Sequence, residues 1–317
     1  MTIGILAVGP YAGLAVFRAL AAIEKVATGS IGGYAAFAVL DETGRVHRVE
    51  TQRGGSTTLF IDGETTGVMP PEEISTARFA AVMSSGPDRP APLSQFVAAA
   101  ENVGLVTGHR LPNAAGVSGV PLNLQIVEGL REGLSVEQAV DKVMDANPHA
   151  DAGVIAADYQ GRVYARNTSR VRARPDLGQS RREDVRFGAV VEVLHNAIFP
   201  TDSLAALATE IAMDTMVPRN HVSGKLLVRS GTPLTAGTSN RVLVDGELRA
   251  MRLEVTDLTI LTGKHNCAAI YLNAEVVKDG RTIGYTLVEP NTMVDEGMIV
   301  SLSGQDMCWV AYRAKQN

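Results

Sequence analysis

The sequence predicts an α/β protein with layers of helices and strands (α+β) in its first half and a β-rich second domain. Apolar residues make up 45% of the 317 residues and charged residues 20%, which is the balance of a globular chain. Helical and strand-like spacings alternate in the first half, whereas short strands and tight turns fill the second. Aromatic residues are only 5%, so we expect a core of aliphatic side chains.

Composition limits the class of partner. The formal net charge of −5 argues against a general binder of nucleic acid or anionic membranes, since both need an extended basic surface. No stretch has the ~18 consecutive apolar residues of a membrane span, and the first residues lack the basic region of a signal peptide. Cys267 and Cys308 are too few for a disulfide scaffold. We therefore expect a cytoplasmic protein with free thiols, a small-molecule substrate or ligand, and no cofactor.

The spacing of apolar residues predicts the helices and strands at the start of the chain. Residues 3–8 form an apolar strand, and Leu14, Phe17, Leu20 and Ile23 then recur at the spacing of a core-facing helix. A hairpin follows at about residues 34–40 and 45–51, and then a strand at 57–61. We expect two helices next, at about 70–83 and 96–101, and a strand at 104–107.

Two further helices precede a second hairpin. They span about residues 122–132 and 136–146, and Ser135 with Gln138 forms a capping box at the start of the second. The second hairpin, like the first, turns at Asp-x-x-Gly and continues with Arg-Val. This is either an internal repeat or two uses of one turn. We favour the turn, because Asp-x-x-Gly suits a tight turn that ends at positive φ.

A charged segment between Arg170 and Arg186 interrupts this pattern, and we place the domain boundary there. The first domain then covers residues 1–178, and the β-rich domain, with one leading helix, covers 187–317. The arginines of this segment form a solvated loop, a subunit contact in a homo-oligomer, or a contact to an anionic ligand or RNA. Aromatic residues are not interleaved with them, which disfavours stacking on a single-stranded nucleic acid.

One segment of the first half resembles a known family. Residues 152–162 read AGVIAADYQGR, which resembles the strand–turn–strand of N-terminal-nucleophile hydrolases, in particular the isoaspartyl peptidases and glycosylasparaginases. In that family a nucleophilic Thr lies two residues before the first Gly, and a Thr-Ser-Thr run closes the second strand. Here Asp151 occupies the nucleophile position, and Asn167-Thr168-Ser169 stands for the Thr-Ser run.

The resemblance implies an αββα sandwich for the first half and hydrolysis of a C–N bond in a small polar amide. The family matures by attack of its Thr hydroxyl on the preceding peptide bond, which frees the α-amine that later acts as base. Asp151 cannot do this, and Ser30 lies at the wrong spacing before the first hairpin turn. We therefore expect a polypeptide that stays intact, without autoprocessing at either residue.

The candidate site combines this segment with the polar loop after the strand at 104–107. In it Asp151 is a base or positioning carboxylate, and Thr168 and Ser169 are hydroxyl donors. His109 is a general base, and Arg110 and Asn113 bind the substrate, with Arg110 as a carboxylate clamp. The alternative for this loop is an ordinary hydrogen-bonded surface loop. The rival function is a non-catalytic binding or assembly protein, and convergence of Asp151, Thr168 and His109 on one pocket would favour the enzyme.

Three other patterns have both a functional and a structural interpretation. Gly54-Gly55-Ser56-Thr57-Thr58 is an anion-binding nest or a bend before a strand. His265 and Cys267 lie on one face of a strand, as a Cys–His pair or as residues of a core-like run. His149 and Asp151 lack further metal ligands in any recognised spacing, so we expect no metal site.

Overall fold

The structure is a computed structural model that describes residues 1–217 and 222–315. The chain consists of two compact units, Met1–Pro218 and Arg219–Asn317. Each has its own hydrophobic core, and each is described by itself below.

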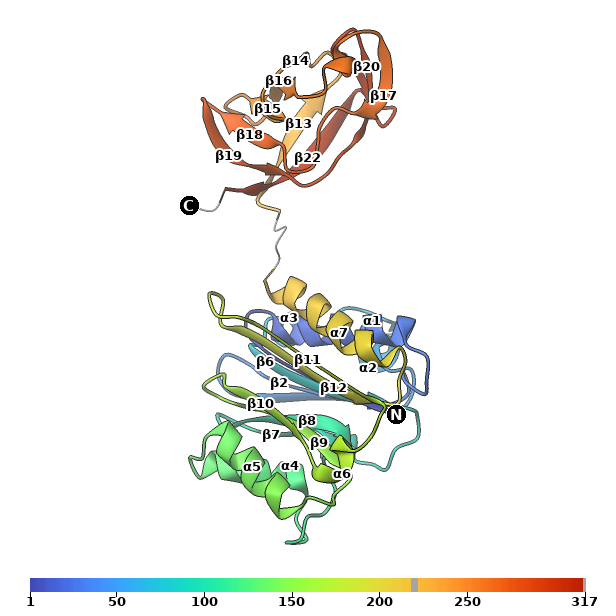
Figure 1. Ribbon diagram of the computed structural model, residues 1–317, viewed down its shortest axis with the longest axis vertical. Helices are drawn as coiled ribbons and strands as arrows, with labels where there is room; N and C mark the ends of the chain where they lie inside the picture. Colours follow the sequence, from blue (N-terminus) through green and yellow to red (C-terminus); the bar gives the residue numbers. More distant parts are fainter. Residues whose placement is uncertain (218–221, 316–317) are drawn as a thin grey trace. The chain divides into compact units, whose positions relative to one another are not determined.

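The first unit has four layers, helices–sheet–sheet–helices (Figure 1). All paired strands in its two main sheets are antiparallel. The first sheet has the order β11 (Leu177–Asp184), β12 (Ala189–Asn196), β1 (Thr2–Val8), β6 (Phe79–Ser85), β2 (Ala35–Leu40), β3 (Val46–Thr51). The second has the order β10 (Val163–Asn167), β9 (Ala152–Asp158), β8 (Gly104–Arg110), β7 (Ala98–Ala100).

Two pairs of helices cover the outer faces of these sheets. Helices α1 (Ala12–Val26) and α7 (Thr201–Met216) lie on the first sheet, and α4 (Leu122–Arg131) and α5 (Val136–Ala146) lie on the second. The shorter elements are α2 (Ser56–Leu59), β4 (Ile61–Asp62), β5 (Thr65–Thr66), α3 (Glu72–Ser75), the 3-10 helix η1 (Leu93–Phe96) and α6 (Ser169–Arg172). The predicted layered α/β fold, an αββα-like sandwich followed by a β-rich part, is confirmed.

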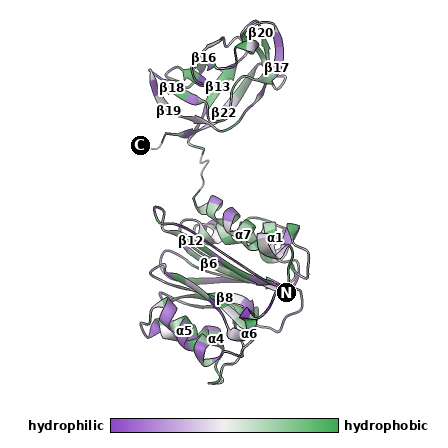
Figure 2. Cartoon of the chain, in the orientation of Figure 1, coloured by the Kyte–Doolittle hydropathy of each residue, from purple (hydrophilic) through white to green (hydrophobic). Residues whose placement is uncertain are grey.

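Alternation along the strands creates three apolar layers. Ile3 and Ile5 of β1 pack against α1 and α7, whereas Leu6 of the same strand packs between the sheets with Leu105 of β8. A third cluster joins the second sheet to α4 and α5. Figure 2 shows the central strands largely green and the outer surface of α5 largely purple. Polar side chains, among them the buried His109 and Asn196, enter the layer between the sheets at one end.

The second unit is almost entirely β-structure. Its core contains Leu226, Leu253 and Val276, all buried. Its larger sheet has the order β13 (Gly224–Arg229), β22 (Met307–Ala314), β19 (Arg281–Thr286), β18 (Glu275–Lys278), β15 (Arg241–Val244), β16 (Ala250–Val255), β14 (Leu234–Ala236). A smaller sheet contains β17 (Lys264–Ala268), β20 (Asn291–Asp295) and β21 (Met298–Leu302), and a 3-10 helix η2 spans Leu258–Leu261.

The predicted domain boundary is wrong by thirty to forty residues, since the units divide after Pro218 and not at 178–187. Strands β11 and β12 belong to the first unit, and so does α7, which was expected to lead the second. The arginine-rich segment was misinterpreted because much of it forms β11, the edge strand of the first sheet. An edge strand can carry many charged side chains, as a loop does, although β11 is paired with β12 along its whole length.

Three local predictions also fail. Residues 57–61 were expected to be a strand, but α2 occupies 56–59. The helix expected over 70–83 is only α3, and β6 begins at Phe79 between β1 and β2. The helix expected over 96–101 is η1 followed by β7. In the second case, the pairing of β6 with β1 and β2, which are distant in sequence, overrides the local pattern.

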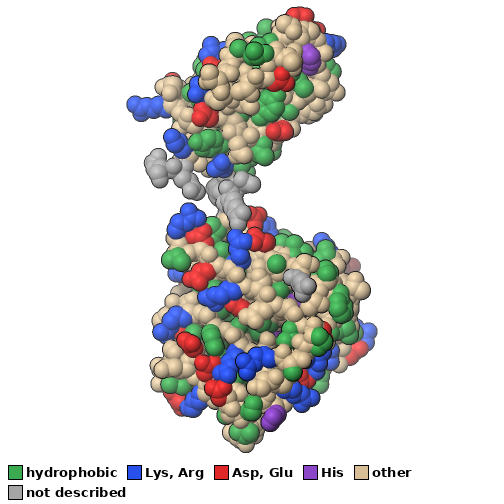
Figure 3. Space-filling view, in the orientation of Figure 1, with side chains coloured by type: hydrophobic (Ala, Val, Ile, Leu, Met, Phe, Trp, Pro, Cys, Tyr) green, Lys and Arg blue, Asp and Glu red, His purple; other side chains and the backbone are tan. Residues whose placement is uncertain are grey.

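The surface of the described residues is mixed in charge. Figure 3 shows Lys and Arg side chains interspersed with Asp and Glu over the visible face. Among the described residues, no helix is both long enough and apolar enough to cross a membrane.

Candidate functional site

Two pockets lie at opposite ends of β1. One, of about 480 Å3, contains Val8, the last residue of the strand; we call it the Tyr159 pocket. The other, of about 410 Å3, contains Thr2, the first residue of the strand; we call it the Thr2 pocket. The Thr2 pocket is lined by Met1, Thr2, Tyr34, Arg89, Pro90, Gln95, Phe96, Arg110, Leu111, Asn113 and Asp151.

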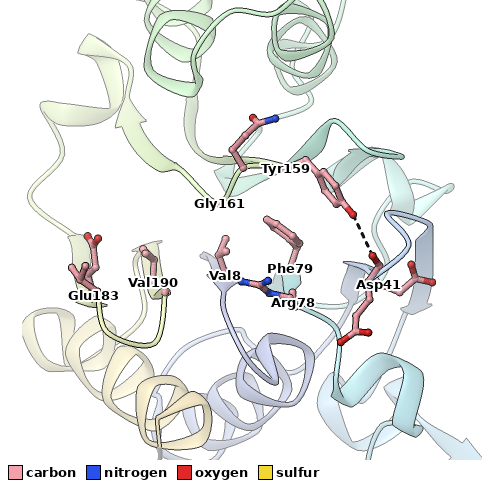
Figure 4. A pocket seen from close by; sticks show the side chains of 12 residues that line it. Val8, Asp41, Arg78, Phe79, Tyr159, Gly161, Glu183 and Val190 are labelled. Carbon is pink, nitrogen blue, oxygen red and sulfur yellow. Dashed lines mark hydrogen bonds between the residues drawn. The ribbon is translucent and has the colours of Figure 1, made fainter.

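The Tyr159 pocket has carboxylates in its lining but no Ser, Thr or Cys nucleophile among the described residues. Phe79 and Val190 form part of its apolar wall, and the Tyr159 ring stacks on Phe79 at 5.4 Å (Figure 4). The Tyr159 hydroxyl donates a hydrogen bond to the backbone carbonyl of Glu42 at 3.4 Å. The described residues that line this pocket include no Ser, Thr, Cys or His. The Thr2 pocket, at the other end of β1, does contain a threonine.

The Thr2 hydroxyl is held between the two sheets. Thr2 is 7% exposed, and its Oγ1 accepts a hydrogen bond from the backbone N–H of Arg110 at 2.6 Å. On the other side it lies 2.8 Å from Oδ1 of Asn196, the last residue of β12. The hydroxyl therefore has a defined position, set by one residue from each sheet, at the wall of a pocket.

Arg110 and Asp151 form a two-point ion pair in this pocket. Arg110 Nε donates to Asp151 Oδ1 at 2.9 Å, and Nη2 donates to Oδ2. The Arg110 guanidinium lowers the pKa of Asp151, and the carboxylate raises the pKa of Arg110. Asp151 is therefore ionised and already paired at neutral pH. Of the two roles predicted for Asp151, a positioning carboxylate fits this geometry better than a base.

Three further side chains leave polar groups ready for a ligand. Arg89 donates to Ser85 Oγ at 2.9 Å and lies over the Tyr34 ring at 5.9 Å, with no carboxylate paired to it among the described residues. The Tyr34 hydroxyl and Asn113 Oδ1 are buried without a hydrogen-bond partner within the described structure. Buried polar groups without partners mark places where a ligand or water is needed. The pocket thus offers a cation, a hydroxyl and a carbonyl.

The sequence-predicted residues divide into three groups. Arg110, Asn113 and Asp151 line the Thr2 pocket, as expected. His109 does not line it, since it is fully buried between the sheets, where burial lowers its pKa. Thr168 also lies outside the residues lining it, as does the exposed Ser169. The expected convergence of Asp151, Thr168 and His109 on one pocket is therefore not found.

Thr168 has a structural use instead. Its hydroxyl donates to the carbonyl of Ala150 at 2.7 Å and accepts from the N–H of Val171 at 3.3 Å, as the N-cap of α6. Ser169, the first residue of α6, accepts a hydrogen bond from Arg172 at 3.3 Å. Neither hydroxyl faces the pocket wall that Thr2 forms.

Sequence reasoning missed Thr2, Tyr34, Arg89 and Asn196. The predicted first strand began at residue 3, so Thr2 was left out of it, although a hydroxyl residue that opens a central strand is itself a signal. Asn196 ends a strand whose pairing with β1 no local pattern reveals. Arg89 lies in the loop between β6 and η1, where no motif indicates a binding site.

The other two sequence patterns, the glycine-rich bend at 54–58 and the pair of His265 and Cys267, have structural roles. The Gly54-Gly55 bend leads into α2, and the Ser56 N–H that follows it donates to the Glu24 carboxyl group at 2.8 Å. Burial raises the pKa of the Cys267 thiol, and His265 Nε2 bonds the Thr262 carbonyl at 2.7 Å rather than the thiol. The described residues contain no group of three or more His, Cys, Asp or Glu able to hold a metal ion.

Comparison with known proteins gives a family without an assigned role. No curated protein matches the chain. A family model described as Domain of unknown function (DUF7259) matches residues 231–307, within the second unit. A second, Domain of unknown function (DUF6963), matches residues 2–225, which cover the four-layer unit from Thr2 onward and make up more than half of the chain. The chain therefore belongs to the DUF6963 family.

Proposed function

We propose that the first unit is a hydrolase of the C–N bond of a small, carboxylate-bearing amide, with the Thr2 hydroxyl as its nucleophile. The observation that carries the proposal is the position of Thr2 Oγ1, fixed by Arg110 and Asn196 at the wall of a pocket with unsatisfied polar groups. Asp151, the residue at the family-like nucleophile position, is replaced in that role by Thr2.

This chemistry requires that the Met1–Thr2 peptide bond be cut, so that Thr2 becomes the first residue. Thr2 then carries a free α-amine beside its own hydroxyl, the pair that activates an N-terminal nucleophile. The amine takes the hydroxyl proton as Oγ1 attacks the amide carbon. The C–N bond breaks, the departing nitrogen receives that proton, and water then hydrolyses the ester left on Thr2.

The electrostatics of the pocket suit a neutral amine. The pKa of the α-amine at Met1 is lowered by burial, and next by Arg110 and Arg89. Both arginines line the pocket that contains Thr2, so an amine freed at Thr2 faces the same positive charges. A lowered pKa leaves the amine free to accept a proton at neutral pH.

The same side chains indicate the substrate class. Arg110 is neutralised by Asp151, so Arg89 is the cation left to hold a substrate carboxylate. Asn113 Oδ1 accepts an N–H, and the Tyr34 hydroxyl donates to a substrate oxygen. The volume of about 410 Å3 suits a small molecule.

The test combines the N-terminus with turnover. Intact mass and N-terminal sequencing of purified protein should find Thr2 as the first residue. That protein should release ammonia or amine from members of a panel of small carboxylated amides. Thr2→Val should abolish release, whereas Ser169→Ala, the matched hydroxyl variant outside the pocket, should retain it. Turnover that survives in Thr2→Val would refute the nucleophile.

A second candidate, a non-catalytic binding protein, is favoured by the contacts of Met1. Its carbonyl accepts a hydrogen bond from the Ser85 hydroxyl, and its sulfur lies 3.2 Å from the backbone nitrogen of Ser30. With Met1 in place Thr2 has no free amine, yet the polar groups of the pocket remain. Purified protein that retains Met1, binds a dicarboxylate such as succinate and turns over no amide would support this function.

A further inference from the structure

A chain of buried polar side chains runs behind the Thr2 hydroxyl. Asn196 Oδ1 lies 2.8 Å from Thr2 Oγ1 and 3.3 Å from His109 Nδ1. On the other side of the imidazole ring, His109 Nε2 lies 2.7 Å from Asn167 Oδ1. His109 and Asn196 are 0% exposed, and this row of polar side chains crosses from the first sheet to the second.

The backbone is shaped to admit this chain. A Cβ at Gly153 of β9 would lie 2.3 Å from His109 Nε2 and 2.0 Å from Asn167 Oδ1. Any side chain at Gly153 would therefore displace the imidazole. This gives a physical reason for the glycine at the start of the family-like segment.

Proton counting decides how the chain is oriented. A neutral imidazole has one N–H, yet both of its nitrogens face an amide oxygen when Asn196 presents Oδ1. In that arrangement the Asn196 Nδ2 donors are also buried without a partner. A half-turn of the Asn196 amide removes both conflicts. Nδ2 then donates to Thr2 Oγ1 and to His109 Nδ1, and the Nε2–H of His109 donates to Asn167.

The half-turn leaves one unpartnered carbonyl oxygen in place of an unpartnered NH2 group. A buried carbonyl without a partner is tolerated better than a buried N–H. The turned arrangement is therefore the more stable of the two.

The turned amide changes what the Thr2 hydroxyl can do. Thr2 Oγ1 now accepts from two donors, the Arg110 N–H and the Asn196 Nδ2–H. Its own proton is left to point toward the α-amine. As that proton passes to the α-amine, the electron pair that held it attacks the substrate carbon. The two donors stabilise the negative charge that builds up on Oγ1 before the new bond is complete.

We propose that Asn196 and His109 are positioning residues for Thr2: His109, with its proton on Nε2, orients the Asn196 amide, which donates to the Thr2 hydroxyl. This inference rests on the proposed function of Thr2. It assigns to His109 a role in orientation, in place of the general-base role expected from the sequence.

The first test needs no variant and no substrate. The 15N shifts of the imidazole nitrogens in the full chain distinguish the two neutral tautomers. We expect His109 to be neutral with its proton on Nε2. A proton on Nδ1 would overturn the inference, whatever the activity of Thr2.

The second test measures Thr2 itself. Full-chain protein with Thr2 at its N-terminus is treated with p-nitrophenyl acetate, and acetylation of Thr2 is followed by peptide mass across a range of pH. Asn196→Asp replaces the donor with an acceptor of the same shape, so the acylation rate at the pH plateau should fall about ten- to a hundredfold. Asn102→Asp, the same substitution at an exposed turn, should leave the rate unchanged.

The outcomes separate the two proposals. No acetylation of Thr2 in the wild-type protein would contradict the proposed function. Acetylation in wild type with an equal plateau rate in Asn196→Asp would contradict only the positioning role. Thermal unfolding of both variants shows whether either has lost its fold. If Asn196→Asp does not fold, the tautomer of His109 in the wild-type protein still tests the positioning role.

Discussion

Gly4 of β1 lies directly against the backbone of Gly108 of β8. A Cβ on Gly4 would lie 2.2 Å from the Gly108 carbonyl oxygen. The two sheets therefore meet backbone to backbone two residues from Thr2 and one residue from His109. This close approach allows the Arg110 N–H of one sheet to reach the Thr2 hydroxyl of the other.

Gly4→Ala should destabilise the first unit by about 1–3 kcal/mol, because the added methyl group forces the sheets apart. Urea unfolding followed by circular dichroism measures the change. Gly246→Ala is the control, since a Cβ there meets nothing within 4 Å and the residue has no positive φ. Equal stability of the two variants would show that the sheets separate at little cost.

Asp151→Asn should lower the free energy of unfolding by about 1–3 kcal/mol at pH 7, because it leaves Arg110 with a neutral partner. The pKa of Asp151 is lowered in the folded state. The ion pair therefore stabilises the fold above the unfolded pKa of about 4 and is lost as pH falls through the lower folded value. The difference in unfolding free energy between wild type and variant should shrink as the pH falls from 7 to 3. A constant difference would contradict the assigned pair.

Leu253→Ala should destabilise the second unit alone, by about 2–5 kcal/mol, since Leu253 is fully buried in its core. Leu20→Ala, in the core of the first unit, is the reciprocal variant. Calorimetry of the full chain should show a separate transition for each unit, with each variant moving one of them. A single transition moved by both would mean that the units unfold together.

Cys267 should react with iodoacetamide more slowly in the native chain than in urea at the same pH. Burial raises the pKa of its thiol, and alkylation needs the thiolate. Mass mapping of both cysteines, which are unpaired in the structure, gives the two rates. Faster reaction of native Cys267 would revive the Cys–His interpretation with His265.

The sequence was sufficient for elements whose signals are local. Ser135 and Gln138 form the predicted capping box, and Gly44 and Gly161 end their Asp-x-x-Gly turns at φ values of 81° and 91°. It was insufficient where pairing is distant. Nothing near Asn196 indicates that β12 lies beside β1, and the arginines of β11 are typical of a loop as well as of an edge strand. The Thr2 pocket combines residues from five separate stretches of the chain, so only its Arg110, Asn113 and Asp151 were found.

The distance along the chain between Thr2 and Asn196, 194 residues, has a consequence for biosynthesis. The first strand lies between β12 and β6, so its ladder cannot close before β12 has left the ribosome. Until then the Thr2 hydroxyl lacks its partner from the first sheet. A nascent chain therefore carries an unformed site for most of its synthesis, and we expect the reactivity of Thr2 to arise only when the unit is complete.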